Sequence, residues 1–147
     1  MTTRLDFGSG YNPRKGFKTC DMTMLPFLDY VFDPDNYKIV NCEDQSIDII
    51  YCRNVLHHIP NLSALFNEFN RILKPNGRIV IIEPTKETFR INVFLDYFWY
   101  RWLIPRPEVW FASNYRDYKK ELTRLFQCVK IFTRNEKELV VYRKVVN

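Results

Sequence analysis

Residues 47–83 constrain the fold more than any other part of the chain, because two β-rich runs there flank an amphipathic helical run. Residues 47–52 are rich in isoleucine and predict a strand. From Leu62 to Leu73, apolar residues recur at i, i+3, i+4, i+7, i+10 and i+11, which predicts a helix with one apolar face. Residues 78–83 are almost all apolar, as in strands buried on both faces. A strand, a helix and a strand joined by short loops predict a right-handed crossover in a parallel sheet.

The rest of the chain extends this unit into a larger sheet. Asn61 is a suitable N-cap for the helix, and residues 74–77 combine a lysine, a proline and a glycine that would end it. Five further strands are predicted, at residues 4–7, 17–21, 29–33, 128–134 and 138–145. The last two, joined by residues 135–137, predict an antiparallel hairpin. We therefore expect a single α/β domain over residues 1–147, with a Rossmann-like, mostly parallel sheet and an antiparallel C-terminal hairpin.

Composition excludes several classes of protein. With 147 residues, 46% of them hydrophobic, the chain suits one domain with a single core. No apolar run reaches the roughly 18 to 20 residues that a membrane-spanning helix needs. The N-terminus lacks the basic and apolar segments of a secretory signal. The four cysteines form no CxxC pair, so we expect reduced thiols and a cytoplasmic location.

The net charge of +5 is concentrated in the second half of the chain. Residues 1–84 contain 9 Lys/Arg and 10 Asp/Glu, whereas residues 85–147 contain 13 and 7. A positive field over the second half favours an acidic substrate, anionic lipid or nucleic acid as a partner. The alternative is a solvated basic face that only keeps the protein in solution, and the sequence leaves both open.

Two glycines follow the first predicted strand, in Gly8-Ser9-Gly10. In an open parallel sheet, ligands bind beyond the carboxyl ends of the strands, and glycine there lets the backbone approach a ligand and adopt positive φ. A tight turn needs the same residues, so the two glycines alone are weak evidence for a ligand site. Two carboxylates at strand ends strengthen this hypothesis. Asp21 ends the second strand, where it can accept both hydroxyls of a ribose, and Asp33 ends the third, within reach of an adenine edge.

Residues 5–84 resemble a class I S-adenosylmethionine-dependent methyltransferase. The family's acid-x-Gly-x-Gly pattern is found at Asp6, Gly8 and Gly10, and its ribose-binding acid at Asp21. Three further stretches resemble the family's sequence around its fourth strand: residues 42–51, 54–59 and 73–78. The short glycine loop with Pro13 resembles a compact, type-11-like subgroup. It implies a cofactor-binding half, residues 1–84, and a substrate and lid half, residues 85–147.

The resemblance also implies the cofactor S-adenosylmethionine and a small-molecule, sugar or lipid-linked acceptor. The implied cofactor contacts are Asp6, Gly8, Ser9, Gly10, Asp21, Met22, Asp33, Arg53 and Asn54. Among them, Asp21 would bind the ribose and Asp33 would lie beside the adenine. The loop at Arg53 and Asn54 would flank the methionine portion. A non-catalytic cofactor-binding regulator or scaffold is the alternative from another class.

Two departures from the family pattern lie in the glycine loop; the second of them, together with the lack of a helix before the first strand, keeps that alternative open. Asn12 stands where the third glycine is usual, and Asn tolerates left-handed geometry better than most residues. Asp21 follows Gly10 by only 11 positions, interrupted by Pro13 and Gly16, so we expect the first helix to be shortened to a turn or absent. The chain also has no helical extension before its first strand, where many relatives place a lid.

Three rival interpretations fit the residues less well. A nicotinamide-binding Rossmann domain would have its third glycine where Pro13 stands. An adenine amino-methyltransferase would carry an Asp/Asn-Pro-Pro-aromatic motif in place of residues 52–55. A cytosine C5 enzyme needs a cysteine after a proline, but Cys52 follows Tyr51 and is interpreted as a core residue.

His57 and His58 are the only histidines. One of them could act as a general base, because imidazole titrates near neutral pH. His57 is the candidate, although its position is commonly acidic in the compact subgroup, and the sequence leaves its role open. In the family the second histidine of this pair mostly braces the loop, so His58 is interpreted as structural. Adjacent histidines point in different directions and have no further ligand at suitable spacing, so no metal site is expected.

Aromatic residues are dense in residues 94–111, which include all three tryptophans. Two arginines, Arg101 and Arg106, are interleaved with these aromatics, and a third, Arg90, precedes them by four positions. One hypothesis is a flap, residues 90–111, that closes over the acceptor and touches a membrane or a lipid-linked sugar. The other is that these aromatics replace core lost with the first helix. Single-stranded nucleic acid ranks third, since no nucleic-acid module is recognised.

Overall fold

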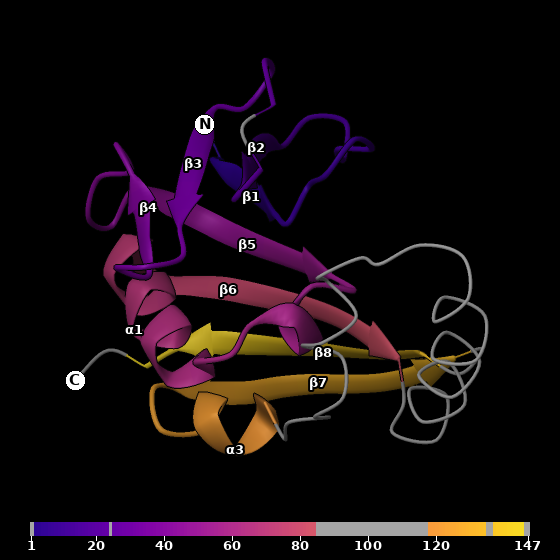
Figure 1. Ribbon diagram of the computed structural model, residues 1–147. Coiled ribbons are helices and arrows are strands. Elements are labelled where there is room, and N and C mark those ends of the chain that lie inside the picture. Colours follow the sequence, from indigo (N-terminus) through magenta and orange to yellow (C-terminus); the bar gives the residue numbers. More distant parts are fainter. Residues whose placement is uncertain (1, 24, 85–117, 135–136, 146–147) are drawn as a thin grey trace.

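The computed structural model describes residues 2–23, 25–84, 118–134 and 137–145. Its centre is an eight-stranded sheet with the strand order β4-β3-β2-β1-β5-β6-β8-β7 (Figure 1). The strands are β1 (Arg4–Phe7), β2 (Lys18–Asp21), β3 (Tyr30–Asp33), β4 (Lys38–Val40), β5 (Ile47–Arg53), β6 (Leu73–Pro84), β7 (Phe126–Arg134) and β8 (Lys137–Lys144).

The pairing directions confirm the mostly parallel sheet. Strands β3, β2, β1, β5 and β6 are parallel to their neighbours in that series. Strand β8 is antiparallel to both β6 and β7, which confirms the C-terminal hairpin. Strand β4 is antiparallel to β3 and was not predicted, because in this three-residue strand only Ile39 is buried.

Helix α1 (Leu62–Ile72) makes the predicted crossover between β5 and β6. The Asn61 side chain accepts a hydrogen bond from the backbone N–H of Ala64 at 3.1 Å, so the predicted N-cap is confirmed. At the other end, Lys144 Nζ donates to the carbonyls of Asn70 and Leu73, at 2.6 and 2.8 Å. The last carbonyls of the helix are therefore capped by a lysine of β8.

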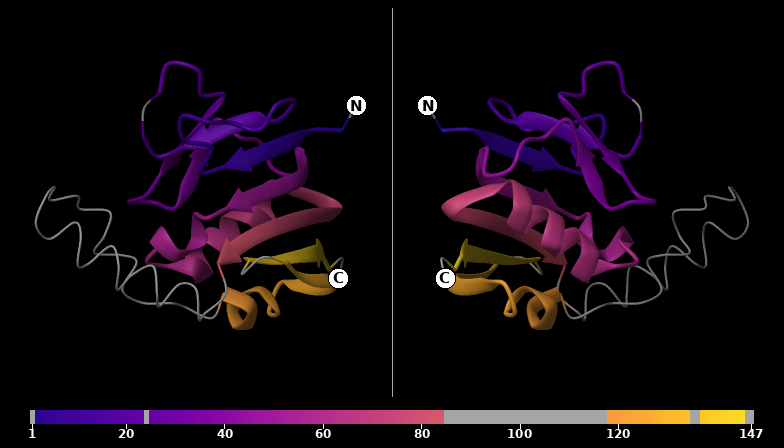
Figure 2. Two further views of the ribbon diagram at one scale, coloured as in Figure 1. Left: turned by 90° about the vertical axis from the view of Figure 1, so that its right-hand side faces the viewer. Right: turned by 90° about the vertical axis from the view of Figure 1, so that its left-hand side faces the viewer.

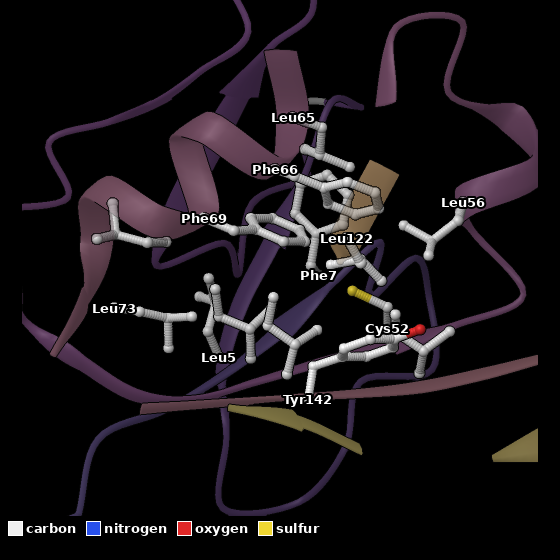
Figure 3. Close-up of a cluster of buried hydrophobic side chains, with 14 of the residues drawn as sticks. Leu5, Phe7, Cys52, Leu56, Leu65, Phe66, Phe69, Leu73, Leu122 and Tyr142 are labelled. Carbon is white, nitrogen blue, oxygen red and sulfur yellow. The ribbon is translucent and has the colours of Figure 1, made fainter. Parts of the chain in front are cut away.

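The core lies between α1 and one face of the sheet. Leu65, Phe66 and Phe69 point from the helix onto Leu5 and Phe7 of β1 (Figure 3). The rings of Phe7 and Phe69 meet edge to face with centroids 5.0 Å apart. Replacing Phe69 with alanine would cost about 3–5 kcal/mol of unfolding free energy.

Within residues 2–84 and 118–145, as far as the structure describes them, helices cover only one face of the sheet (Figure 2). Helices α1 and α3 (Tyr118–Leu122) lie on the same side of it (Figure 2). Between β1 and β2, residues 8–17 form turns and no helix, which agrees with the shortened first helix expected from the sequence. Core-facing Ile81 and Val140 are fully buried, whereas Val80 and Val141 on the opposite face are partly exposed.

The described residues bear on three further expectations, on membrane spans, on cysteines and on the flap. Within the described residues, no helix is long and apolar enough to cross a membrane. All four cysteines are free, and only Cys128 is exposed. The predicted flap at residues 90–111 lies outside the described residues, as do residues 135–136 of the predicted hairpin turn.

Candidate functional site

The glycine loop begins at the carboxyl end of β1 and turns sharply toward β2. The backbone N–H groups of Gly8 and Ser9 both donate to the carbonyl of Cys20, at 2.8 and 3.1 Å. Gly8 and Gly10 have φ of +70° and +51°, the left-handed region that glycine adopts without a Cβ penalty. The loop is therefore built around backbone conformations that only glycine takes readily.

Two carboxylates fix the loop in place of the missing helix. Asp21 Oδ2 accepts a hydrogen bond from the Gly10 N–H at 2.9 Å, and Oδ1 accepts one from the Thr23 N–H at 3.0 Å. Farther along, Asp6 Oδ2 accepts from the Arg14 N–H at 2.7 Å. Asp6 is buried, and this burial raises the pKa of its carboxyl. The loop is thus tied to the ends of β1 and β2 at two points.

The loop also leaves room and an unused polar atom for a ligand. Ser9 Oγ is the single buried side-chain nitrogen or oxygen of the described residues that has no hydrogen-bond partner. Buried hydroxyls normally have partners, so an unpaired one calls for an explanation. A Cβ built on Gly10 would meet nothing within 4 Å. Both features fit a ligand that rests against the loop, as the implied cofactor would.

The turn after β5 packs directly against this loop. A Cβ on Gly8 would lie 2.4 Å from Cγ2 of Val55, so only glycine allows this contact. Asn54, in the left-handed region with φ of +51°, donates its N–H to the carbonyl of Ile82 at 2.9 Å. Arg53 and Asn54 are exposed at the end of β5, where the predicted methionine-side contacts would be needed.

Glu83, at the end of β6, organises that turn. Its Oε1 accepts hydrogen bonds from the N–H groups of Val55 and Leu56, at 2.8 and 2.9 Å. Its Oε2 shares a hydrogen bond of 2.6 Å with Nδ1 of His57. Glu83 is 3% exposed. Glu83 was not predicted as a site residue, although a lone carboxylate at the end of an otherwise apolar strand is a signal that could have identified it.

The glycine loop and the turn after β5 are therefore in contact. The link runs from the Glu83 carboxylate through the backbone of Val55 to the side-chain contact with Gly8. His57 lies two residues further along, in the short 3-10 helix Leu56–His58. The predicted base thus belongs to the same edge of the sheet as the predicted cofactor loop.

Asp33 is engaged in its own turn. Its carboxylate accepts hydrogen bonds from the Asp35 N–H at 2.9 Å, the Asn36 N–H at 3.3 Å and Asn36 Nδ2 at 2.8 Å. These hydrogen bonds, led by that from the Asn36 side chain, lower the pKa of Asp33. Met22, also predicted to contact the cofactor, is 59% exposed beside Asp21.

Cys52, His58 and a possible metal site were also considered in the sequence. Cys52 is fully buried, and burial raises its pKa well above the ordinary value, which agrees with its interpretation as a core residue. The His58 ring is tilted against that of His57, with centroids 4.1 Å apart. Within the described parts of the chain, no group of three His, Cys, Asp or Glu side chains could hold a metal ion.

Comparison with known proteins decides the family. A family model described as a methyltransferase domain matches residues 5–130. The chain belongs to the methyltransferase family. This match agrees with the resemblance found in the sequence and extends well beyond its residues 5–84, and S-adenosylmethionine is the methyl donor of the class I family. The nicotinamide-binding alternative is thereby set aside.

Individual relatives of this methyltransferase are distant. A highly reducing polyketide synthase of Pyrenophora dematioidea is 35% identical over 60 residues, covering 41% of this chain and 2% of its own length. The demethylmenaquinone methyltransferase of Geobacillus sp. is 28% identical over 75 residues, 51% of this chain and 32% of its own. A SAM-dependent methyltransferase of Aquifex aeolicus has a similar fold, with a TM-score of 0.63 at 17% identity over 99% of this chain and 82% of its own. The chain thus spans less than half of the length of the polyketide synthase and of the demethylmenaquinone methyltransferase.

Proposed function

We propose that the chain transfers the methyl group of S-adenosylmethionine to a small-molecule, sugar or lipid-linked acceptor. The observation that carries the proposal is the contact between the glycine loop and the turn that holds His57. The family match and the unpaired Ser9 hydroxyl support the cofactor part. The acceptor part rests on the sequence resemblance and on the chemistry available at His57.

The proposed cofactor contacts follow the edge of the sheet. Gly8, Ser9 and Gly10 would let the backbone approach the cofactor, and Ser9 Oγ would gain the partner that it lacks. Asp21 has further lone pairs on both oxygens, which suit the ribose hydroxyls. The other proposed contacts are Asp6 through its hold on the loop, Asp33 beside the adenine, Arg53 and Asn54 beside the methionine portion, and Met22.

His57 is the proposed general base. With the Glu83 carboxylate as acceptor, Nδ1 carries the proton and donates it in the 2.6 Å hydrogen bond, which leaves the lone pair on Nε2. Nε2 would accept the proton of an acceptor hydroxyl as its oxygen attacks the methyl carbon. The sulfonium supplies the activation, because it leaves as a neutral thioether that keeps the electron pair of the broken bond. Glu83 would orient the ring and stabilise the imidazolium that forms.

The first test is calorimetric titration with S-adenosylmethionine, followed by release of S-adenosylhomocysteine with panels of hydroxyl-bearing small molecules, sugar nucleotides and lipid-linked sugars. Once an acceptor is found, His57→Asn should lower kcat by 100-fold or more, in the range of general-base catalysis. Affinity for S-adenosylmethionine should remain unchanged.

The matched control is His58→Asn, which removes the neighbouring imidazole. It should retain most of the turnover, whereas the pH dependence of kcat should change only in the His57 variant. Full turnover in His57→Asn would remove the base from the proposal. No binding of S-adenosylmethionine by the intact protein would overturn the proposal as a whole.

A further inference from the structure

The face of the sheet opposite α1 carries an unusual row of arginines. The strand register places Arg4 beside Ile49, Ile49 beside Arg78, and Arg78 beside Arg143. Residues directly opposite on neighbouring strands point to the same face, with Cβ atoms roughly 5 Å apart. Arg4, Arg78 and Arg143, which we call the arginine row, therefore share one face.

Nothing in the described part of the chain balances this charge. The ion pairs there include none to Arg78 or Arg143. Like charges directly opposite each other in a sheet are destabilising. Arg4 lies 5.9 Å from the centroid of the Phe17 ring and has no carboxylate in those ion pairs either. A directly paired Arg78 and Arg143 are thus a cost to the isolated chain that an anionic partner would relieve.

Beside the arginine row, β6 and β8 carry four partly exposed apolar side chains on the same face. Val80 pairs with Val141 and Ile82 with Leu139, and all four side chains are only partly buried. We call these four residues the apolar patch. Toward β1 the same face is covered differently, since Phe17 packs on Tyr51 and the Arg14 guanidinium lies 4.2 Å from the centroid of the Tyr51 ring.

Partly exposed apolar side chains, on a face that no described helix covers, are unusual for this kind of sheet. Sheets built from parallel strands are normally covered on both faces, mostly by helices. Both described helices, however, lie on the other side (Figure 2). Strands β6 and β8 are also paired along both edges, so a partner could not add a strand there and would have to lie on the face.

We propose that this face binds an amphipathic α-helix of a partner protein. Its apolar stripe would cover the apolar patch, and its carboxylates would lie over Arg78 and Arg143. A helix about 10 Å wide spans two strands spaced about 4.8 Å apart. From Arg78 to Ile82 the strand extends about 13 Å, which equals about nine helical residues.

Other occupants match the face less well. A second copy of the chain would bring one arginine row against another in a two-fold contact, and like charges there are repulsive. A bilayer would meet the long arginine side chains before the half-buried apolar patch. A partner helix would use both the apolar patch and the arginine row. Burial of the patch supplies contact area, and the arginines select acidic side chains.

The test is selection from a displayed library of 14-residue helical peptides with randomised surface positions. The selected peptides should carry an apolar stripe and Asp or Glu at one end. Their binding should shift the amide resonances of β6 and β8 in the intact protein. Arg78→Glu with Arg143→Glu should weaken binding at least 10-fold, and exchange of the peptide carboxylates for lysine should restore binding to this variant.

The matched control reverses two exposed charges on the α3 side, Lys120→Glu with Arg124→Glu, and should leave peptide binding unchanged. If charge reversal disturbs the circular dichroism spectrum, Arg78→Ala with Arg143→Ala replaces it. Failure to enrich any peptide, or equal binding to the arginine variant, would overturn the proposal. So would arginine-dependent binding to phosphatidylserine vesicles, or a dimer of the free protein, in the absence of peptide binding. None of these readouts depends on methyl transfer.

Discussion

The backbone N–H of Gly10 donates to the carboxylate of Asp21 across 2.9 Å. The residue proposed to hold the ribose therefore also holds the loop proposed to receive the rest of the cofactor. In a chain without a helix between β1 and β2, this hydrogen bond and that between Asp6 and the Arg14 N–H are the two carboxylate contacts that fix the loop. Loop shape and ligand affinity should consequently change together.

Asp21→Ala should weaken S-adenosylmethionine binding by about 1.5–3 kcal/mol, the range for a lost hydrogen bond to a charged group, which is about 10- to 150-fold in Kd. Isothermal titration calorimetry measures this loss. Asp35→Ala, which removes an exposed carboxylate from the turn after β3, should retain the wild-type Kd. Unchanged affinity in an Asp21→Ala protein with a normal melting curve would contradict the ribose assignment.

Gly10→Val should abolish cofactor binding with only a modest loss of stability. The added side chain would point into open space, so its cost to the free protein is the left-handed backbone, about 1–2 kcal/mol. Gly16→Val is the matched control, because Gly16 also has positive φ, of +79°, and open surroundings. Thermal shift with and without S-adenosylmethionine should show ligand stabilisation in the Gly16 variant and none in the Gly10 variant.

Glu83→Ala and Glu83→Gln should differ in stability. Alanine leaves the buried N–H groups of Val55 and Leu56 without their acceptor, at about 1–3 kcal/mol each. Glutamine keeps one oxygen for these groups and changes mainly the contact with His57. Urea unfolding should show a clearly larger loss for alanine, and equal losses would mean that Glu83 does not hold the turn.

Glu68 should contribute to acid sensitivity. Burial opposes its ionisation, but hydrogen bonds from Arg71, the Ile39 N–H and Lys38 outweigh burial and lower the pKa of Glu68 below its ordinary 4.5. A lowered folded-state pKa means that this stabilisation is complete above about pH 4.5 and is lost as pH falls through the folded-state pKa.

Glu68→Gln should therefore be less stable than wild type at pH 7, by about 1.5–3 kcal/mol, and should lose less stability between pH 5 and pH 3. Melting temperatures across this range measure the difference. Glu43→Gln, at an exposed carboxylate, should follow the wild-type curve. Parallel curves for Glu68→Gln and wild type would exclude Glu68 as a source of acid sensitivity.

Periodicity and turn chemistry predicted most of the fold from the sequence. The helix with its Asn61 cap, the seven predicted strands and the C-terminal hairpin all occur in the structure. Strand β4 escaped prediction because it is short and gains its place by pairing with β3 and by the hydrogen bond from its Ile39 N–H to Glu68. Neither contact leaves a periodic pattern in the sequence.

The site was predictable where it depends on local sequence and not where it depends on long-range contacts. Gly8, Gly10 and Asp21 stand beside strand ends and could be named from their positions. Glu83 serves residues 26 to 28 positions earlier, so its role emerges only when β5 and β6 are adjacent. The arginine row depends on register, since its members come from β1, β6 and β8.

The lysine that caps α1 has a consequence for biosynthesis. Lys144 reaches carbonyls that are 71 to 74 positions earlier in the chain, and β8 is the strand that pairs with the outer edge of β6. During translation, the C-terminal end of α1 stays uncapped and the outer edge of β6 stays unpaired until β8 has left the ribosome. By then nearly the whole described chain has been synthesised. An unpaired edge of this kind invites association with other chains. The nascent protein should thus be most vulnerable to aggregation just before β8 emerges.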